Sequence, residues 1–294
     1  MTIQHFLTLK DLPVVDIRGI VERAAGLKND PNLAANVSRK TLGLVFEKSS
    51  TRTRAAFEVA MTQMGGSSMF LKSSDSQLGR GEPIEDTSKV LSSIVDGLVL
   101  RTMDHKTQEE FAQNSTVPII NGLSNMSHPC QLLADLLTFK EEKGEIEGKK
   151  VAWCGDFNNV CKSYAEAAKI FNFDLWVCCP KEFMPKNKGL YKHVNFTSSL
   201  EEGIKDSAIV TTDVWVSMGD EKESAKRKNE FRNYQVNEKV LDMASSDVIF
   251  LHCLPAVRGQ EISKNLFNDP RSRVWNQAEN RLHAQKGLLV ELLN

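Results

Sequence analysis

Hydroxyl and arginine side chains gather between a predicted strand (42–46) and a predicted helix (51–64). They are Ser50, Thr51, Arg52 and Thr53. The N-terminus of a helix leaves backbone N–H groups without intrahelical acceptors, and the arginine adds a planar cationic fork. Phosphate is the anion that best fits such a combination. A capped helix with surface arginines remains the alternative interpretation.

Two further cationic side chains follow predicted strands of the first half of the chain. Arg101 comes directly after the strand 97–100, and His128 precedes Pro129 and a predicted helix. Ligands of open α/β sheets bind outside the carboxyl ends of the strands, so both residues lie where functional groups are expected. The alternatives are a surface arginine and a histidine that merely caps a helix. The region offers too few ligands for a metal site.

Polar groups also follow the strands of the second half. Asn158 and Asn159 come after the strand 151–154, in the slot where a dinucleotide fold carries Gly-x-Gly-x-x-Gly. That glycine pattern is absent, which argues against a nicotinamide-dependent oxidoreductase. Asparagine amides can instead bind a polar ligand. Asp213 follows the predicted strand 208–211, and its carboxylate could pair with an ammonium group.

Cys253 follows the predicted strand 248–252, within His-Cys-Leu-Pro. A lone cysteine after a strand is most often structural. A covalent nucleophile would need a nearby base. The adjacent His252 does not provide one, because neighbours along a strand point to opposite faces. We therefore expect a non-covalent role for Cys253.

Short apolar runs alternate with helical patterns along nearly the whole chain, which predicts an α/β fold with parallel sheets. The predicted strands are 42–46, 68–71, 97–100, 117–120, 151–154, 175–178, 208–211 and 248–252. The predicted helices are 14–25, 51–64, 85–94, 107–113, 129–142, 160–171 and 276–292. The mixed-charge run 221–232 is expected to be a solvated helix or a mobile loop.

A charged, glycine-containing segment near residue 145 separates two halves of similar size. We predict a first domain at 1–143, joined by a returning C-terminal helix at 276–294, and a second domain at 144–275. The polar clusters at the strand ends, three in each half, predict a cleft between two lobes.

The composition is that of an ordinary globular protein. Of the 294 residues, 37 are Lys or Arg and 38 are Asp or Glu, which leaves a formal net charge of −1. This balance argues against a general binder of nucleic acid or of membrane surfaces. The six cysteines have no metal-finger spacing and predict reduced thiols. With no signal-like start and no apolar run of ~18 residues, we expect a cytoplasmic protein.

Four motifs, in this order and spacing, resemble the signature set of the aspartate/ornithine carbamoyltransferase family. They are Ser-Thr-Arg-Thr (50–53), His-Pro-x-Gln (128–131), Asp-x-x-x-Ser-Met-Gly (213–219) and His-Cys-Leu-Pro (252–255). The resemblance covers essentially the whole chain. The first two motifs are shared with the aspartate-specific relatives, whereas the last two, together with Lys48, point to the ornithine branch.

The resemblance implies transfer of a carbamoyl group from carbamoyl phosphate to the δ-amino group of L-ornithine, without metal or organic cofactor. It assigns carbamoyl phosphate to Ser50, Thr51, Arg52, Thr53, Gln77, Arg101, His128, Gln131, Cys253, Leu254 and Arg281. It assigns ornithine to Asn159, Asp213, Ser217 and Met218. The catalytic residues would be Arg52, Arg101, His128 and Cys253. A homotrimer, or a multiple of trimers, is implied, with the loop of Gln77 reaching a neighbouring subunit's site.

These assignments leave rival functions that the residues can separate. Aspartate as acceptor would need cations for its second carboxylate, and putrescine would give Asn159 little to orient. An acylated ornithine is a further acceptor. A non-catalytic two-lobed binding protein would not need Arg52, Arg101, His128 and Arg281 together. The stretch from Ser217, with the charged run after it, is expected to act as a lid.

Overall fold

The computed structural model describes residues 4–30, 33, 37–216 and 221–293. The chain divides into two units. Unit 1 comprises Met1–Leu137 and Glu279–Asn294, and unit 2 comprises Thr138–Ala278. Both borders between the units fall inside helices. The first lies between residues 137 and 138, before residue 144, the predicted start of a second domain. The last part of the C-terminal helix belongs to unit 1.

Unit 1 is built on a four-stranded parallel sheet with the strand order β2-β1-β3-β4. The strands are β1 (Thr41–Phe46), β2 (Ser67–Lys72), β3 (Gly97–Arg101) and β4 (Ile119–Leu123). The α-helices are α1 (Val14–Asn29), α2 (Thr51–Gln63), α3 (Ile84–Ser92), α4 (His105–Asn114), and parts of α5 (Pro129–Lys143) and α10 (Val274–Leu293). Short 3₁₀ turns are η2 (Ser73–Asp75) and η3 (Leu78–Arg80).

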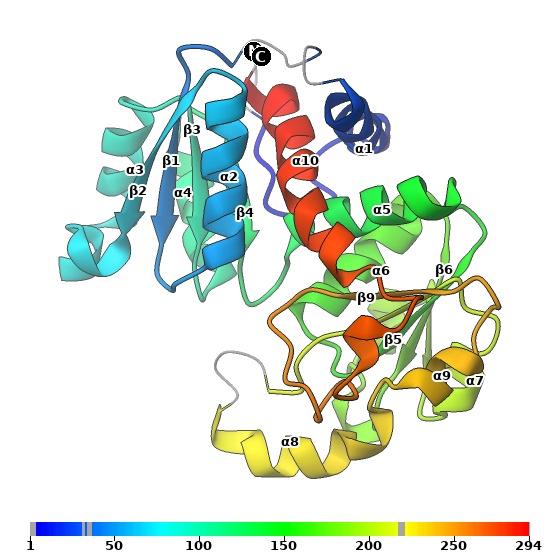
Figure 1. Cartoon of the computed structure of the whole chain (residues 1–294). Coiled ribbons are helices and arrows are strands. Elements are labelled where there is room, and N and C mark those ends of the chain that lie inside the picture. The colour runs from blue at the N-terminus through cyan, green and yellow to red at the C-terminus, as the bar shows by residue number, and fades with distance from the viewer. Residues whose placement is uncertain (1–3, 31–32, 34–36, 217–220, 294) are drawn as a thin grey trace. The chain divides into compact units, whose positions relative to one another are not determined.

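The strand order of unit 1 decides where its helices lie. The chain moves one way along the sheet from β1 to β2 and then reverses towards β3 and β4. Because such crossovers are right-handed, α2 covers one face, and α3 and α4 cover the other (Figure 1). The reversal opens a switch point between β1 and β3, where ligands of such sheets bind.

The core of unit 1 lies between the sheet and these helices. Leu98, Leu100, Phe111 and Ile119 are fully buried there, and each such side chain contributes roughly 1.5–3 kcal/mol of burial free energy. The end of α10 packs closely on α1, where Gly287 lies so near the α1 backbone that a Cβ atom would come within 2.6 Å of a carbonyl oxygen. Only glycine permits this approach.

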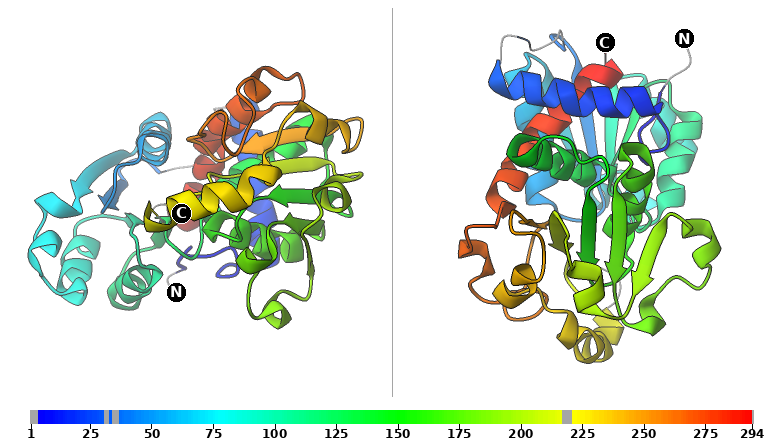
Figure 2. Two further views of the ribbon diagram at one scale, coloured as in Figure 1. Left: turned by 90° about the horizontal axis from the view of Figure 1, so that it is seen from below. Right: turned by 90° about the vertical axis from the view of Figure 1, so that its right-hand side faces the viewer.

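Unit 2 is built on a five-stranded parallel sheet with the order β7-β6-β5-β8-β9, whose strands run side by side in the right-hand view of Figure 2. They are β5 (Lys150–Cys154), β6 (Asp174–Cys178), β7 (Val194–Thr197), β8 (Ile209–Thr212) and β9 (Ile249–His252). Its remaining α-helices are α6 (Asn159–Phe171), α7 (Leu200–Ile204), α8 (Ser224–Phe231) and α9 (Glu238–Asp242). The 3₁₀ turns are η4 (Lys181–Phe183), η5 (Lys188–Tyr191), η6 (Glu221–Glu223), η7 (Arg232–Tyr234) and η8 (Leu266–Asn268). The switch point here lies between β5 and β8.

The structure confirms the predicted α/β class and the eight predicted strands, with one strand displaced. The strand expected at 117–120 begins only at Ile119, because Pro118 has no N–H to donate to a sheet ladder. Sequence patterns missed β7, a four-residue edge strand, and the five-residue helices α7 and α9. Helix α8 occupies the run that was expected to be a solvated helix or a mobile loop. In the described part of the chain, no helix is long and apolar enough to cross a membrane.

Candidate functional site

Helix α2 begins at the switch point of unit 1 with unused backbone donors. Ser50 occupies the N-cap position in an extended conformation, but its side chain makes no capping hydrogen bond. The first backbone hydrogen bond of the helix runs from the N–H of Arg54 to the carbonyl of Ser50. The N–H groups of residues 51–53 therefore donate to no described atom, and an anion can accept from them.

The hydroxyl of Thr53 is the point where two arginines meet. Its Oγ1 accepts from Arg101 Nη1 at 3.5 Å and from Arg281 Nη2 at 3.2 Å. Thr53 is 2% exposed, and its O–H proton has no acceptor among the described residues. With both lone pairs facing guanidinium donors, this proton is directed to a ligand. Gly122 leaves room for the cluster, because a Cβ there would lie 3.4 Å from the methyl group of Thr53.

A chain of side chains fixes Arg281. Its Nη1 donates to Gln131 Oε1 at 2.8 Å, and Gln131 Nε2 donates to Asp135 Oδ1 at 2.8 Å. All three side chains are buried. The carboxylate sets the orientation of the amide, and the amide oxygen then holds the guanidinium in place. Sequence reasoning missed Asp135, which lies one turn after Gln131 on α5.

The electrostatics of this cluster favour an anion. Burial, together with the charges of Arg281 and Arg52, lowers the pKa of Arg101 to about 10. Burial, reinforced by Arg281 and Arg101, holds the pKa of His128 well below its usual range. Neither Arg52 nor Arg101 forms a salt bridge with a described residue.

The backbone around Arg101 is held by Glu47, a residue that the sequence did not single out. The N–H of Glu47, just after β1, donates to the carbonyl of Arg101 at 2.9 Å, and its Oε2 accepts from the N–H of Met103 at 2.7 Å. Glu47 thus ties the ends of β1 and β3 together. Gln77, by contrast, is exposed in the loop between η2 and η3.

A second set of polar residues lies at the switch point of unit 2. Asn158 caps α6, accepting from the N–H groups of Val160 and Cys161 at 3.0 and 3.1 Å. Its Nδ2 donates to Asp213 Oδ2 at 2.8 Å, and Asp213 Oδ1 accepts from the N–H of Val214 at 2.7 Å. Within the described ranges, Asp213 has no cationic partner. It therefore remains an anion that an ammonium group can neutralise.

The predicted ornithine residues fare differently in the structure. Asp213 lies at this switch point, but its amide partner is Asn158, whereas Asn159 is the first residue of α6. Ser217 and Met218, with the start of the expected lid, lie outside the described residues. The sequence pattern offered two adjacent asparagines, and only the N-cap geometry shows which of them turns to Asp213.

An ion pair joins Asp156, just after β5, to helix α8. Arg227 Nη1 lies 2.7 Å from Asp156 Oδ2, with 10% and 14% of the two side chains exposed. The same nitrogen donates to the carbonyl of Trp215 at 3.4 Å. Asp156 is thus neutralised within unit 2, which sets it apart from Asp213.

The loop that carries Cys253 is held by a buried histidine. His252 Nδ1 accepts from the N–H of Leu254 at 2.9 Å, and its Nε2 lies 3.3 Å from Glu261 Oε1. The N–H of Val257 donates to the same carboxylate oxygen. His252 and Glu261 are fully buried. Leu254 has a φ of 51°, a conformation that leucine rarely adopts, so this loop stores backbone strain.

The described residues contain no cluster of three or more His, Cys, Asp or Glu that could hold a metal ion. All six cysteines are free, and only Cys253 is not fully buried.

Two models of one protein family match the chain. The model described as "Aspartate/ornithine carbamoyltransferase, carbamoyl-P binding domain" matches residues 4–141, and the Asp/Orn binding domain of the same family matches residues 147–292. The chain belongs to the aspartate/ornithine carbamoyltransferase family. The second match runs into α10, although the end of that helix belongs to unit 1 by its contacts.

Members of this family include curated and solved relatives that match over the full length. The anabolic ornithine carbamoyltransferase of Pseudomonas aeruginosa is 50% identical, covering 100% of this chain and 98% of its own. The anabolic ornithine carbamoyltransferase of Campylobacter jejuni is 40% identical, with a TM-score of 0.92 over 99% of both chains. The ornithine carbamoyltransferase of Pyrococcus furiosus is 42% identical, with a TM-score of 0.92 over 99% of this chain and 97% of its own.

Proposed function

We propose that this protein is an ornithine carbamoyltransferase that forms L-citrulline and phosphate from carbamoyl phosphate and L-ornithine. The observation that carries the proposal is the Thr53 hydroxyl, which faces two arginines beside the open N-terminus of α2. A dianionic phosphate with an adjacent carbonyl group uses both features. The family and the anabolic relatives support the same activity and a role in arginine biosynthesis.

Carbamoyl phosphate binds, in this proposal, to unit 1. Arg52 and the free N–H groups of α2 bind the phosphate oxygens, and Arg101 and Arg281 supply further positive charge that balances the phosphate dianion. The proposed contacts are Ser50, Thr51, Arg52, Thr53, Gln77, Arg101, His128, Gln131 and Arg281, with Cys253 and Leu254 from the His-Cys-Leu-Pro loop. The matching domains are residues 1–143 with 276–294 for carbamoyl phosphate, and 144–275 for ornithine.

The same groups suit the chemistry of carbamoyl transfer. As the δ-amino nitrogen adds to the carbamoyl carbon, negative charge develops on the carbonyl oxygen. Arg101, the Thr53 hydroxyl and His128 are the donors for this charge. The low pKa of His128 keeps its ring neutral, so the ring donates a hydrogen bond without giving up a proton. The C–O bond to phosphate then breaks, and a phosphate oxygen takes the proton of the amine.

Ornithine binds, in this proposal, through the switch point of unit 2. Asp213 pairs with the α-ammonium group, because it is the carboxylate there without a cationic partner among the described residues. Asn159, Ser217 and Met218 orient the rest of the amino acid, with Asn158 holding Asp213. The δ-amine must be neutral to react, although the pKa of a free alkyl amine is ~10.4. Cys253 is proposed to help place that amine without a covalent intermediate.

The same proposal covers the assembly and the location of the protein. A homotrimer, or a multiple of trimers, with the loop of Gln77 serving a neighbouring site, gives an otherwise exposed glutamine a function. A reducing cytoplasm suits six free cysteines, because burial raises the pKa of Cys130 and of Cys179 to about 12 and keeps both as thiols.

An acceptor assay tests the proposed function. The protein is incubated with carbamoyl phosphate and, separately, with ornithine, aspartate, putrescine or acetylornithine, and the ureido product is measured. We expect product from ornithine above all. Turnover of aspartate, putrescine or acetylornithine in its place would overturn the assignment.

A variant controls for the phosphate site. Arg52→Ala should lose about 10²–10³-fold in rate, because a cation that stabilises the charge of the departing phosphate is removed. The protein should stay folded, since the Arg52 side chain forms no hydrogen bond or ion pair with the described residues. Retained turnover would refute the proposed phosphate contacts.

A further inference from the structure

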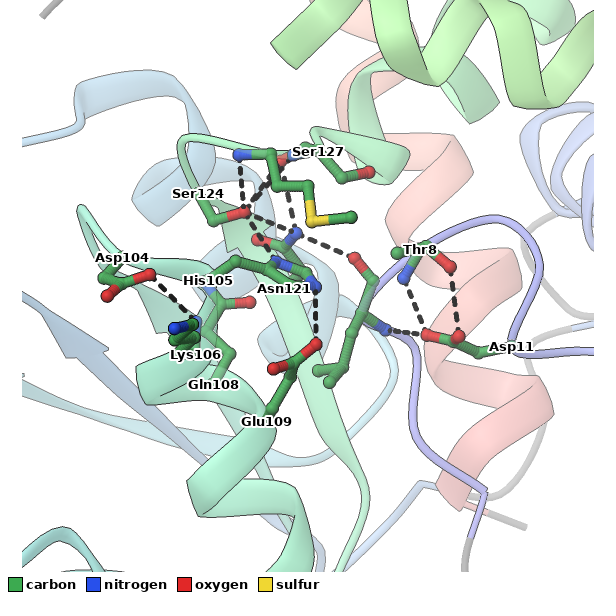
Figure 3. Close-up of polar contacts among 12 residues, drawn as sticks. Thr8, Asp11, Asp104, His105, Lys106, Gln108, Glu109, Asn121, Ser124 and Ser127 are labelled. Carbon is green, nitrogen blue, oxygen red and sulfur yellow. Dashed lines mark hydrogen bonds and ion pairs between the residues drawn. The ribbon is translucent and has the colours of Figure 1, made fainter. Parts of the chain in front are cut away.

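Figure 3 shows a polar network around Ser124 and Ser127. These two residues belong to the turn that precedes His128 in the chain. His105 begins α4, where Asp104 caps the helix by accepting from the N–H of Lys106. The His105 ring is 5% exposed, and its Nδ1 lies 2.8 Å from Ser124 Oγ, which is fully buried. This histidine is close in sequence to Arg101, yet it contacts a different loop.

The contacts of Ser124 assign the proton on the histidine ring. Ser124 Oγ accepts from the N–H groups of Met126 and Ser127, both at 3.3 Å. With its oxygen facing these donors, the hydroxyl has one proton to donate. Its two acceptors are His105 Nδ1 at 2.8 Å and the carbonyl of Ser127 at 3.4 Å, and we assign the hydrogen bond to the closer one, so that Nδ1 accepts. The remaining proton of the neutral ring is then on Nε2, the side that faces Glu109, whose Oε1 is 3.9 Å away.

The same network fixes the turn from several sides. The N–H of Ser124 donates to the carbonyl of Ser127 at 3.0 Å, and the N–H of His105 donates to Asn125 Oδ1 at 3.1 Å. Asn121 Nδ2 donates to the carbonyls of Ser127 and Leu7 at 3.2 and 2.8 Å. Ser127 immediately precedes His128 in the chain, so the position of the Ser127 backbone restricts where the His128 ring can lie.

We propose that His105 is a positioning residue for carbamoyl transfer: through Ser124 it sets the turn 124–127 and thereby the position of the His128 ring. This inference rests on the proposed function. His105 touches no proposed substrate contact itself. Its effect should therefore appear in the rate of the chemical step, where a displacement of about 1 Å can cost 10²-fold, and less in the binding of phosphate by Arg52.

Two substitutions of His105 in the full chain separate positioning from packing. His105→Asn places an amide oxygen near the position of Nδ1 and keeps an acceptor for Ser124. His105→Gln places its amide beyond that position and leaves the serine proton without this acceptor. We expect His105→Gln to lower kcat by roughly 10- to 100-fold with the KM for ornithine unchanged, and His105→Asn to stay within about threefold of the wild type.

Matched controls make the test decisive. Glu109→Gln, on the other side of the ring, should leave kcat unchanged. Inorganic phosphate should raise the melting temperature of every folded variant as it does that of the wild type. If His105→Gln does not fold, Ser124→Ala carries the same expectation for kcat. Wild-type kcat in His105→Gln, or equal losses in both His105 variants, would overturn the proposal.

A spectroscopic measurement is independent of activity. In the wild-type protein, side-chain ¹⁵N shifts of His105 should show a protonated Nε2 and an unprotonated Nδ1. A protonated Nδ1 would overturn the inferred network even if citrulline is formed. Failure to form citrulline, with the expected tautomer observed, would instead count against the proposed function.

Discussion

Unit 1 carries an excess of positive charge at its switch point, whereas unit 2 carries an excess of negative charge. Arg52, Arg101 and Arg281 lie at the first without a carboxylate between them. At the second, Arg227 neutralises Asp156 and leaves Asp213 as the anion. The difference shows that one sheet topology can present sites of opposite charge. The sheet fixes only the location of the site, and the side chains supply its charge.

The largest effect is expected from removing a cation of unit 1. Arg101→Met should lower kcat by about 10²–10³-fold, since a donor to the carbamoyl oxygen is lost. Its melting temperature should not fall, because the like charges of Arg281 and Arg52 and the burial of its own cation already disfavour Arg101. Citrulline formation and thermal unfolding measure the two effects. A large loss of stability would show that Arg101 supports the fold.

The corresponding change in unit 2 should behave in the opposite way. Arg227→Met leaves Asp156 as a largely buried carboxylate without its cation, so the free energy of unfolding should fall by roughly 3 kcal/mol. Chemical denaturation measures this loss. The double variant Arg227→Met, Asp156→Asn should recover most of it, and no recovery would mean that the ion pair is not the cause.

Removing the charge of Asp213 in unit 2 should weaken the binding of ornithine without changing the binding of phosphate. Asp213→Asn should raise the KM for ornithine by about 10²-fold, since a charge-assisted contact of roughly 1.5–3 kcal/mol is lost. The increase in melting temperature that inorganic phosphate produces should be the same as in the wild type. If that increase disappears as well, the two sites are not separable as the comparison requires.

The smallest expected effect is the pH dependence that His128 contributes. Its pKa is lowered in the folded protein, so below pH about 6.5 the unfolded chain binds a proton that the folded chain does not. Stability should therefore fall as the pH drops through about 6.5 towards the lowered pKa. His128→Gln should show a shallower decrease between pH 6.5 and 5 in chemical denaturation. An unchanged slope would mean that His128 titrates normally.

Much of the fold followed from local patterns, and the exceptions have physical causes. Buried parallel strands are short and apolar on both faces, so eight of them could be predicted from the sequence. The edge strand β7 has only one neighbour, and its two middle residues are partly exposed while its first and last are buried. Such a strand carries little pattern of its own and forms because β6 offers it a partner.

The candidate site was predictable where a motif lies on one segment. Ser50 to Thr53 could be placed at a helix start because strand, turn and helix follow each other in the chain. Arg281 could be assigned only by resemblance, since 228 residues separate it from the Thr53 hydroxyl to which it donates. Glu47 and Asp135 gave no signal, and the pattern could not separate Asn158 from Asn159, because such a carboxylate or amide is recognised by its partners and not by its type.

The sequence alone determined the chemical inventory of the protein: the hydroxyls, the arginines and the alternation of strands and helices. Tertiary structure decided how the members of that inventory act on one another. It buried Arg101 and set it with Arg281 on one hydroxyl, which lowers the pKa of Arg101, and it paired Asp156 with Arg227 while Asp213 has no cationic partner among the described residues. Charge and hydrogen bonding act over a few ångströms of space, and only the folded chain brings distant residues that close.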